Sequence, residues 1–155
     1  MISFEPITEE TLYIADEIVR SNHLYNALEN GRQTRTAKEL KTAYLPSSTK
    51  SLFVKADDTY VGILDYMEKN PNDGQFWIGA LLIHEAYHGY SFGTQAYLAF
   101  EAELPDTLPA IRLGVLKSNP RAKVFWERLG FHTYAESNVN GALVDCMEKV
   151  LRNEE

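Results

Sequence analysis

The sequence predicts a mixed α/β fold, in which a central and mostly antiparallel sheet of about seven strands carries four helices on its two faces. Two apolar segments are separated only by Asp57-Asp58, and a short turn of this kind joins antiparallel strands. The segment 75–83 is apolar almost throughout, as a central strand is. A helix and a further strand, 110–116, follow it, and a strand–helix–strand crossover pairs its strands in parallel.

Seven segments have the apolar pattern and the flanking turn residues of strands. They are 2–7, 51–56, 60–68, 75–83, 110–116, 131–136 and 143–150. The clearest turn signals are the cluster Asn70–Gly74 and the pair Asn140-Gly141, since these residue types favour tight turns. We therefore expect a hairpin at the end of the chain.

Four segments are expected to form helices. The first opens at Thr8, which can cap a helix, and the acidic residues Glu9 and Glu10 suit its positive end. Its apolar stripe fades near Asn22. The other three helices are expected at 36–44, at 94–104 and from Ser118 to Gly130.

The bulk composition is that of one globular domain. The chain has 155 residues, of which 45% are hydrophobic and 24% charged, and this length can bury a full core. No apolar run approaches the roughly 20 residues that cross a bilayer, and the first residues lack the pattern of a signal peptide. We expect a single domain, 1–155, without a membrane partner.

Charge and cysteine content narrow the classes of partner and location. The formal net charge is -7, which argues against nucleic acid because phosphate binding needs a surplus of Lys and Arg. A cationic substrate is mildly favoured, and solubility is the alternative reason for the charge. Cys146, the one cysteine, cannot form an internal disulfide, which fits a cytoplasmic location. No Cys/His cluster has metal-ligand spacing, so no metal is expected.

The most informative segment is 78–94, where an apolar strand ends in a loop that leads directly into a helix. Backbone N–H groups in the first turn of a helix have no partner within it, and the helix dipole adds positive charge there. A phosphate or pyrophosphate is the natural occupant of such a site. Gly89 and Gly93 are expected to allow close backbone approach and positive φ angles.

Two motifs give the chain a resemblance to a known family. The loop His88-Gly89-Tyr90-Ser91-Phe92-Gly93 is similar to the pattern Q/R-x-x-G-x-G/A, with His and Ser at two signature positions. The segment Asn119–Phe131, NPRAKVFWERLGF, is similar to N-x-x-A-x-x-F-Y-x-x-x-G-F. With the order of the predicted elements, these motifs resemble the GNAT superfamily of acetyl-coenzyme A-dependent N-acetyltransferases.

The resemblance implies a GNAT-like sheet in which the parallel strands 75–83 and 110–116 splay apart. Backbone groups near the end of the first of these strands would pair with the pantetheine arm and the acetyl carbonyl, and the loop N–H groups would hold the pyrophosphate. The implied cosubstrate is acetyl-CoA. The implied cofactor-binding residues are Leu81, Leu82, Ile83, His88, Gly89, Tyr90, Ser91, Phe92, Gly93, Thr94, Asn119, Ala122 and Phe125.

Acetyl transfer to an amine needs a base for the amine, a donor for the developing oxyanion and an acid for the leaving thiolate. Trp126 stands at the family's Tyr position, and an indole is no useful proton source. We expect Trp126 to shape the pocket, with core packing as the alternative. Where other members carry Glu or His, this chain has Trp77 and Gly79.

Two carboxylates are candidates for the general base. Asp65 lies on the neighbouring strand and Glu85 at the end of the strand 75–83. For each, a solvated or capping carboxylate is the favoured alternative. The segment 21–44 is the least family-like, and His23–Asn26, Glu29 and Arg32 could line an acceptor pocket or form an ordinary loop.

The leading hypothesis is an acetyl-CoA-dependent N-acetyltransferase acting on a primary amine of a small molecule or a peptide. The alternative is a CoA-binding module with weak catalysis and a sensory or regulatory role, which the missing Tyr, the missing base and Ser91 favour. O-acetyl transfer and a different acyl donor are further options. A homodimer through the apolar last strand, 143–150, would follow if that strand lies near a sheet edge.

Overall fold

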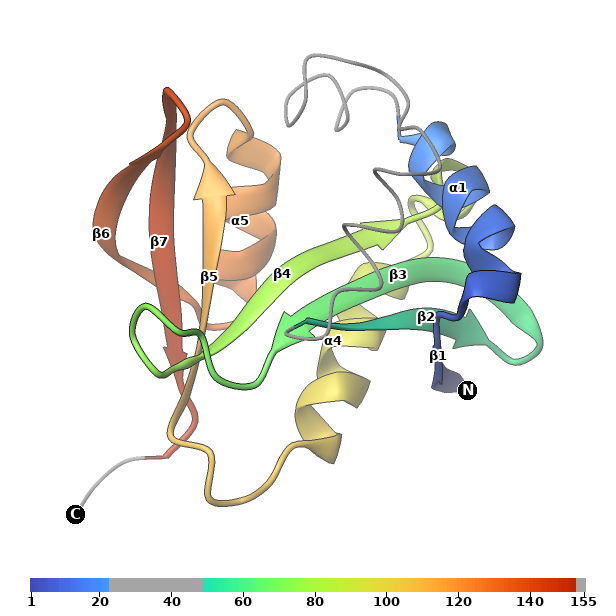
Figure 1. The fold of residues 1–155 in the computed structure, drawn as a ribbon, viewed down its shortest axis with the longest axis horizontal. Helices are drawn as coiled ribbons and strands as arrows, with labels where there is room; N and C mark the ends of the chain where they lie inside the picture. Colours follow the sequence, from blue (N-terminus) through green and yellow to red (C-terminus); the bar gives the residue numbers. More distant parts are fainter. Residues whose placement is uncertain (23–48, 153–155) are drawn as a thin grey trace. The chain divides into compact units, whose positions relative to one another are not determined.

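The computed structural model describes residues 1–22 and 49–152 of the chain (Figure 1). Its strands are β1 (Ile2–Pro6), β2 (Lys50–Ala56), β3 (Thr59–Met67), β4 (Phe76–Ile83), β5 (Ala110–Leu116), β6 (His132–Val139) and β7 (Ala142–Val150). Its α-helices are α1 (Leu12–Ser21), α4 (Phe92–Glu103) and α5 (Pro120–Arg128), with 3-10 turns η1 (Glu9–Thr11) and η2 (Glu85–Tyr87). The fourth expected helix, 36–44, lies outside the described residues.

The seven strands form one mixed sheet in the order β1-β2-β3-β4-β5-β7-β6. β1 with β2, β2 with β3, β5 with β7 and β6 with β7 are antiparallel, whereas β4 and β5 are parallel. The predicted mixed α/β sheet and its parallel pair are therefore confirmed. Within residues 1–22 and 49–152, no helix is long and apolar enough to cross a membrane.

The chain divides into two compact units. Unit 1 contains residues 1–67 and 80–103, and unit 2 contains residues 68–79 and 104–155. β4 contributes its first half to unit 2 and its second half to unit 1. That the whole chain is one domain stays a prediction.

In unit 1, α1 and α4 cover opposite faces of the strands. Phe53 and Ile63 are register partners in β2 and β3, and they share one buried cluster with the apolar residues of α1. Phe4, whose partner in β2 is Val54, points to the other face, where its ring lies 6.0 Å from the ring of Phe100 in α4. Successive residues of a strand point to opposite faces, so helices lie on both faces, as predicted.

In unit 2, α5 packs against β5, and the buried face of the sheet lies under it. Trp126 of α5 meets the ring of Phe131 at 5.3 Å between centroids. The buried strand residues of this unit alternate along β5 and recur in β7: Ile111, Leu113, Val115 and Met147. This alternation is the period of two that a half-covered sheet requires.

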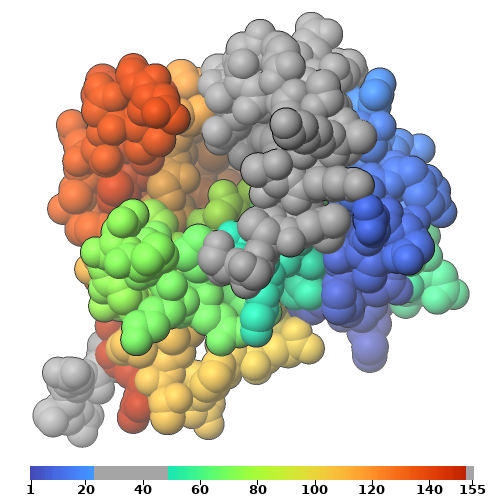
Figure 2. All heavy atoms as spheres, viewed as in Figure 1, coloured from blue at the N-terminus to red at the C-terminus, as the bar shows by residue number. Residues whose placement is uncertain are grey.

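The final hairpin is longer than predicted, and its strands are ordered differently. β6 continues to Val139, because Asn140 and Gly141 take positive φ angles of 51° and 87° and close a two-residue turn. β7 lies between β5 and β6, so the edge strand is β6, not the apolar last strand. All eight residues of β6 are exposed, and its atoms form an outer surface of unit 2 (Figure 2). A homodimer stays a prediction.

Candidate functional site

The parallel pairing of β4 with β5 is short. It covers only Phe76 with Ile111, Trp77 with Arg112 and Ile78 with Leu113, although β4 continues to Ile83. The remaining residues of β4 therefore keep backbone groups that the ladder to β5 does not use. An amide-rich ligand can satisfy such groups, which is the feature expected for strands that splay apart.

β4 ends in a compact loop that leads into α4. His84 opens the 3-10 turn η2, and its Nδ1 accepts the N–H of Ala86 at 3.0 Å. The carbonyl of Ser91 accepts the N–H of Gln95 at 3.0 Å, which places Ser91 at the cap position of α4. The N–H groups of residues 92–94, in the first turn, have no partner within the helix. The predicted succession of strand, loop and helix N-terminus is thus present, and anion binding there stays a prediction.

Two exposed residues of this loop have left-handed backbone, and one of them differs from the prediction. Gly89 has a φ of 87°, as expected, but the second positive φ, 64°, belongs to Ser91. The expectation of a positive φ at Gly93 is wrong, because α4 begins at Phe92, two residues earlier than predicted. A residue inside an α-helix has a negative φ, so Gly93 has ordinary helical backbone.

The end of β4 is held by side chains that sequence reasoning missed. The carbonyl of Ile83 accepts hydrogen bonds from Asn22 Nδ2 at 3.1 Å and from His88 Nε2 at 2.6 Å. The Oγ of Ser21 accepts the N–H of Glu85 at 3.1 Å. The sequence predicts for Asn22 only the end of a helix, and its contact with a residue 61 positions away has no local signal.

The structure brings the loop candidates together within unit 1. Leu82 is buried at 4% exposure, Leu81 and Ile83 are half-buried, and 88–91 are exposed. Phe92, Gly93 and Thr94 form the first turn of α4. The ring of Tyr90, 65% exposed, lies 6.2 Å from that of Phe92.

The other cofactor candidates lie on α5, in unit 2. Asn119 caps this helix, because its Oδ1 accepts the N–H of Ala122 at 3.3 Å. Phe125 is half-exposed, and its ring lies 4.9 Å from that of Trp126. Trp126 is only 8% exposed and also meets the ring of Phe131. This packing agrees with the alternative that Trp126 belongs to the core.

A buried carboxylate supports the loop that precedes α5. Asp145, 4% exposed, pairs with Lys117 at 2.9 Å and with Lys123 at 3.3 Å, and Lys117 also meets Glu136. The hydrogen bond from Lys117 is the largest cause that lowers the pKa of Asp145, and Lys123 adds to it. The two lysines flank Asn119, so this cluster holds the start of α5.

The two candidate bases differ in their surroundings. Asp65 is buried in β3, opposite Ser51 of β2, on the face that α1 covers. Glu85 is exposed in η2, where its carbonyl accepts the N–H of His88 at 3.2 Å. These surroundings do not test a catalytic role, so both stay predictions.

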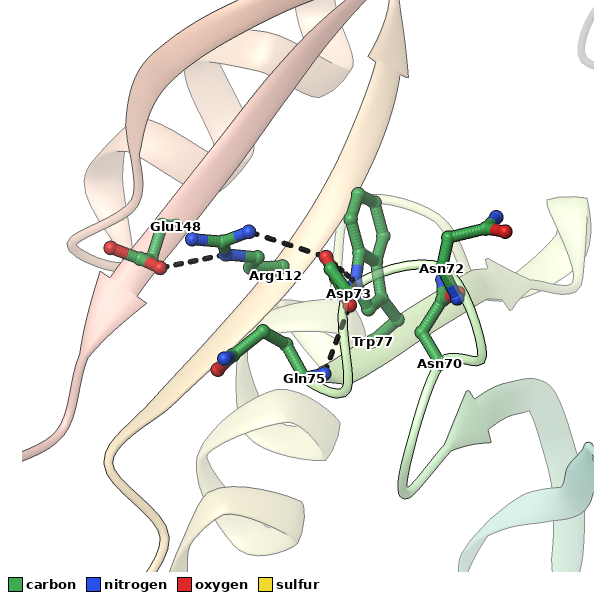
Figure 3. A network of polar contacts seen from close by, with 7 residues as sticks. All are labelled: Asn70, Asn72, Asp73, Gln75, Trp77, Arg112 and Glu148. Carbon is green, nitrogen blue, oxygen red and sulfur yellow. Dashed lines mark hydrogen bonds and ion pairs between the residues drawn. The ribbon is translucent and has the colours of Figure 1, made fainter.

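Trp77, one of the two positions where the resemblance would place a base, belongs to a polar network (Figure 3). The indole N–H of Trp77 donates to Asp73 at 2.8 Å, and Arg112 bridges Asp73 at 3.2 Å and Glu148 at 2.8 Å. Burial alone would raise the pKa of Asp73, but hydrogen bonds from the Gln75 N–H, Trp77 and Arg112 outweigh it and lower the pKa. A carboxylate whose pKa is lowered in this way is a weaker base than a free one, and the contacts of the network join the 70–75 turn to β4, β5 and β7.

Among the described residues, no group of three or more His, Cys, Asp or Glu side chains could hold a metal ion.

Comparisons with solved structures identify the fold. An acetyltransferase from Thermus thermophilus superposes with a TM-score of 0.80 at 23% identity, covering 97% of each chain. The spermidine N-acetyltransferase of Vibrio cholerae, solved with CoA and spermine, gives 0.72 at 18% identity, with 97% of this chain and 95% of that one covered. The ribosomal-protein-S18-alanine N-acetyltransferase of Escherichia coli gives 0.74 at 12% identity, covering 100% and 97%. These identities establish a shared fold only.

The sequence itself establishes the family. No curated protein matches the chain significantly. The profile of the acetyltransferase (GNAT) family, in contrast, matches residues 6–131, which include both motifs and parts of both units. The chain therefore belongs to the acetyltransferase (GNAT) family of N-acetyltransferases.

Proposed function

We propose that this chain is an acetyl-CoA-dependent N-acetyltransferase that transfers an acetyl group to a primary amine of a small molecule or a peptide. One observation carries the proposal: β4 leads through left-handed backbone at Gly89 and Ser91 into the N-terminus of α4. Backbone N–H groups and the helix dipole then meet at one place, which suits a pyrophosphate. The GNAT family uses acetyl-CoA as its acyl donor, and acetyl-CoA carries such a pyrophosphate.

The hydrogen-bond donors of the loop suit acetyl-CoA as a ligand. The N–H groups of 89–94 are main-chain donors for an anion, and the backbone of Leu81–Ile83 is left to an amide-rich arm. The Ile83 carbonyl already accepts two hydrogen bonds, so we expect a ligand to use other backbone groups of β4. On α5, Asn119, Ala122 and Phe125 are candidates through the family motif alone.

Acetyl-CoA supplies an acyl group activated as a thioester. A neutral amine attacks the thioester carbonyl, the new C–N bond forms, the C–S bond breaks, and the amine proton leaves so that the thiolate can be protonated. A backbone N–H of β4 is the proposed oxyanion donor. Asp65 or Glu85 is the proposed base, directly or through water, and Trp126 is proposed to shape the pocket wall.

The acceptor is proposed only as a class. The similar structures from V. cholerae and E. coli are named for spermidine and for a protein alanine, so proteins of this fold are named for both small amines and protein residues. The net charge of -7 favours a cationic amine. An acceptor panel must therefore include polyamines, small monoamines and peptides with free N-termini.

Binding is the first test. A thermal shift series compares acetyl-CoA, CoA, ATP and no ligand, because a ligand at about 100 times its Kd stabilises the fold by roughly 2.7 kcal/mol. Stabilisation by acetyl-CoA and CoA but not by ATP supports the donor site. No stabilisation by acetyl-CoA, under conditions in which another family member responds, contradicts the proposal.

Turnover is the second test. Release of free thiol is followed with each acceptor, and the mass of the product distinguishes N-acetyl transfer from O-acetyl transfer or from another acyl group. Binding of acetyl-CoA without thiol release from any acceptor would favour the CoA-binding regulatory module instead.

A further inference from the structure

The carbonyl of Ile83, the last residue of β4, is clamped between two side chains from different elements. Asn22 Nδ2, at the end of α1, lies 3.1 Å from this oxygen, and His88 Nε2, in the loop after β4, lies 2.6 Å from it. A carbonyl oxygen has two lone pairs and can only accept. Both pairs are therefore used, and His88 must carry its proton on Nε2.

The rest of this peptide unit is fixed as well. The N–H of His84, which belongs to the same peptide as the Ile83 carbonyl, donates to the carbonyl of Val61 in β3 at 2.8 Å. The orientation of the peptide plane at the end of β4 thus follows from three hydrogen bonds. Any rotation of this peptide plane would break at least one of them, and each broken bond is a loss of stability.

The clamp also joins α1 to the loop. Asn22 closes α1, since its own N–H donates to Val19 at 3.1 Å and its Nδ2 also reaches the Ile18 carbonyl at 2.9 Å. The adjacent Ser21 accepts the N–H of Glu85 at 3.1 Å. Two neighbouring residues at the end of α1 therefore hold residues 83 and 85, on both sides of His84.

We propose that His88 and Asn22 are positioning residues for the acyl donor, acting through the Ile83 peptide and not by direct contact with the reacting atoms. The proposal rests on the proposed function, because the loop that the clamp fixes is the one that would hold the pyrophosphate. His88 stands at the first position of the family loop pattern, where Gln or Arg is expected. The amide of a glutamine can donate from the same place as Nε2–H of the imidazole.

The proposed role of His88 is to donate a hydrogen bond to the Ile83 carbonyl. Substitutions can separate this role from acid–base catalysis. His88→Ala removes the donor, whereas His88→Gln keeps it without an imidazole. His132→Ala is the control, because His132 is an exposed histidine of β6 in unit 2. Circular dichroism and thermal unfolding establish that each variant is folded.

We expect His88→Ala and Asn22→Ala to raise the Kd and the KM for acetyl-CoA about tenfold, as the loss of one hydrogen bond does, with kcat nearly unchanged. His88→Gln restores most of the lost affinity, and His132→Ala matches the wild type. In the ligand-free protein, hydrogen exchange at the amides of His84 and Glu85 is faster in His88→Ala than in His88→Gln.

Three outcomes overturn the proposal. Equal losses of affinity in His88→Ala and His88→Gln would mean a contact specific to imidazole. A fall in kcat at unchanged KM would mean a direct catalytic role. Unchanged affinity and exchange in both alanine variants would mean that the clamp positions nothing. A wild-type protein that does not bind acetyl-CoA refutes the proposed function instead, and hydrogen exchange still reports on the clamp.

Discussion

Gly89 and Gly141 have the same φ angle at two different places in the chain. Each has a φ of 87°, and an added Cβ would meet no atom within 4 Å at either position. An alanine therefore costs only backbone strain, about 1–2 kcal/mol for an L-residue in left-handed backbone. It regains roughly 0.4–1 kcal/mol by restricting the unfolded chain. Each variant should lose about 1 kcal/mol of unfolding free energy.

The two variants should differ in their affinity for acetyl-CoA. Gly89 lies in the loop between β4 and α4, and an alanine that relaxes toward negative φ rotates the N–H groups that follow it. We propose that these N–H groups donate hydrogen bonds to the pyrophosphate of acetyl-CoA. Losing one of those bonds should weaken the binding of acetyl-CoA about tenfold. Gly141 lies in the β6–β7 turn, so Gly141→Ala should bind acetyl-CoA as the wild type does.

Thermal unfolding and isothermal titration calorimetry of both variants make the comparison. Each Tm should fall by about 2–4 °C, while only Gly89→Ala loses affinity. Equal affinity losses in the two variants would refute the reasoning, because the effect would then come from general destabilisation. A Gly89→Ala variant that is destabilised but keeps wild-type affinity would also refute the reasoning, because the loop backbone would then not hold acetyl-CoA.

Three other contacts give predictions of their own. A Cβ at Gly62 would overlap a backbone carbonyl oxygen of β4, so Gly62→Ala should lower the unfolding free energy, measured in urea, by about 2–3 kcal/mol. The control is Gly114→Ala, which should lose clearly less, because its Cβ meets only a side-chain carbon at 3.0 Å. The pKa of Asp145 is lowered, first by Lys117, so its ionised form stabilises the fold above the unfolded-state pKa. The stability advantage of the wild type over Asp145→Asn should therefore shrink as pH falls from about 7 to about 3, as thermal unfolding across that range would measure. Trp126→Tyr should lower the Tm without raising kcat, because the indole is packed between rings; a higher kcat would instead indicate that the missing acid limits the reaction.

Local sequence is sufficient wherever local chemistry decides the structure. The turn at Asp57 has a φ of 53°, and Asn140 one of 51°, which are conformations that Asp and Asn tolerate better than most residues. Asn119 caps α5 ahead of Pro120, as the residue types indicate. In each of these places the deciding contacts lie within a few residues of one another.

Longer-range features could not be predicted in this way. The insertion of β7 between β5 and β6 depends on which strand β5 meets, and nothing within β7 encodes it. The start of α4 at Phe92 is an exception, because Ser91 directly before it is a residue type that commonly caps helices. The hydrogen bond from Asn22 to Ile83 joins residues 61 positions apart, and it needs the assembled sheet.

The departure from the family loop pattern at Ser91 has a physical explanation. Ser91 keeps the left-handed φ, 64°, that the family glycine would adopt freely, at a cost of about 1 kcal/mol. Its carbonyl still accepts the Gln95 N–H, so α4 begins in place and its N–H groups keep their direction. Because the proposed pyrophosphate donors are main-chain groups, backbone geometry decides whether the loop can bind, and side-chain identity matters less. For the proposed base the reverse holds, because it would be a side chain and neither motif determines which one; substitution of Asp65 and of Glu85 tests the two candidates.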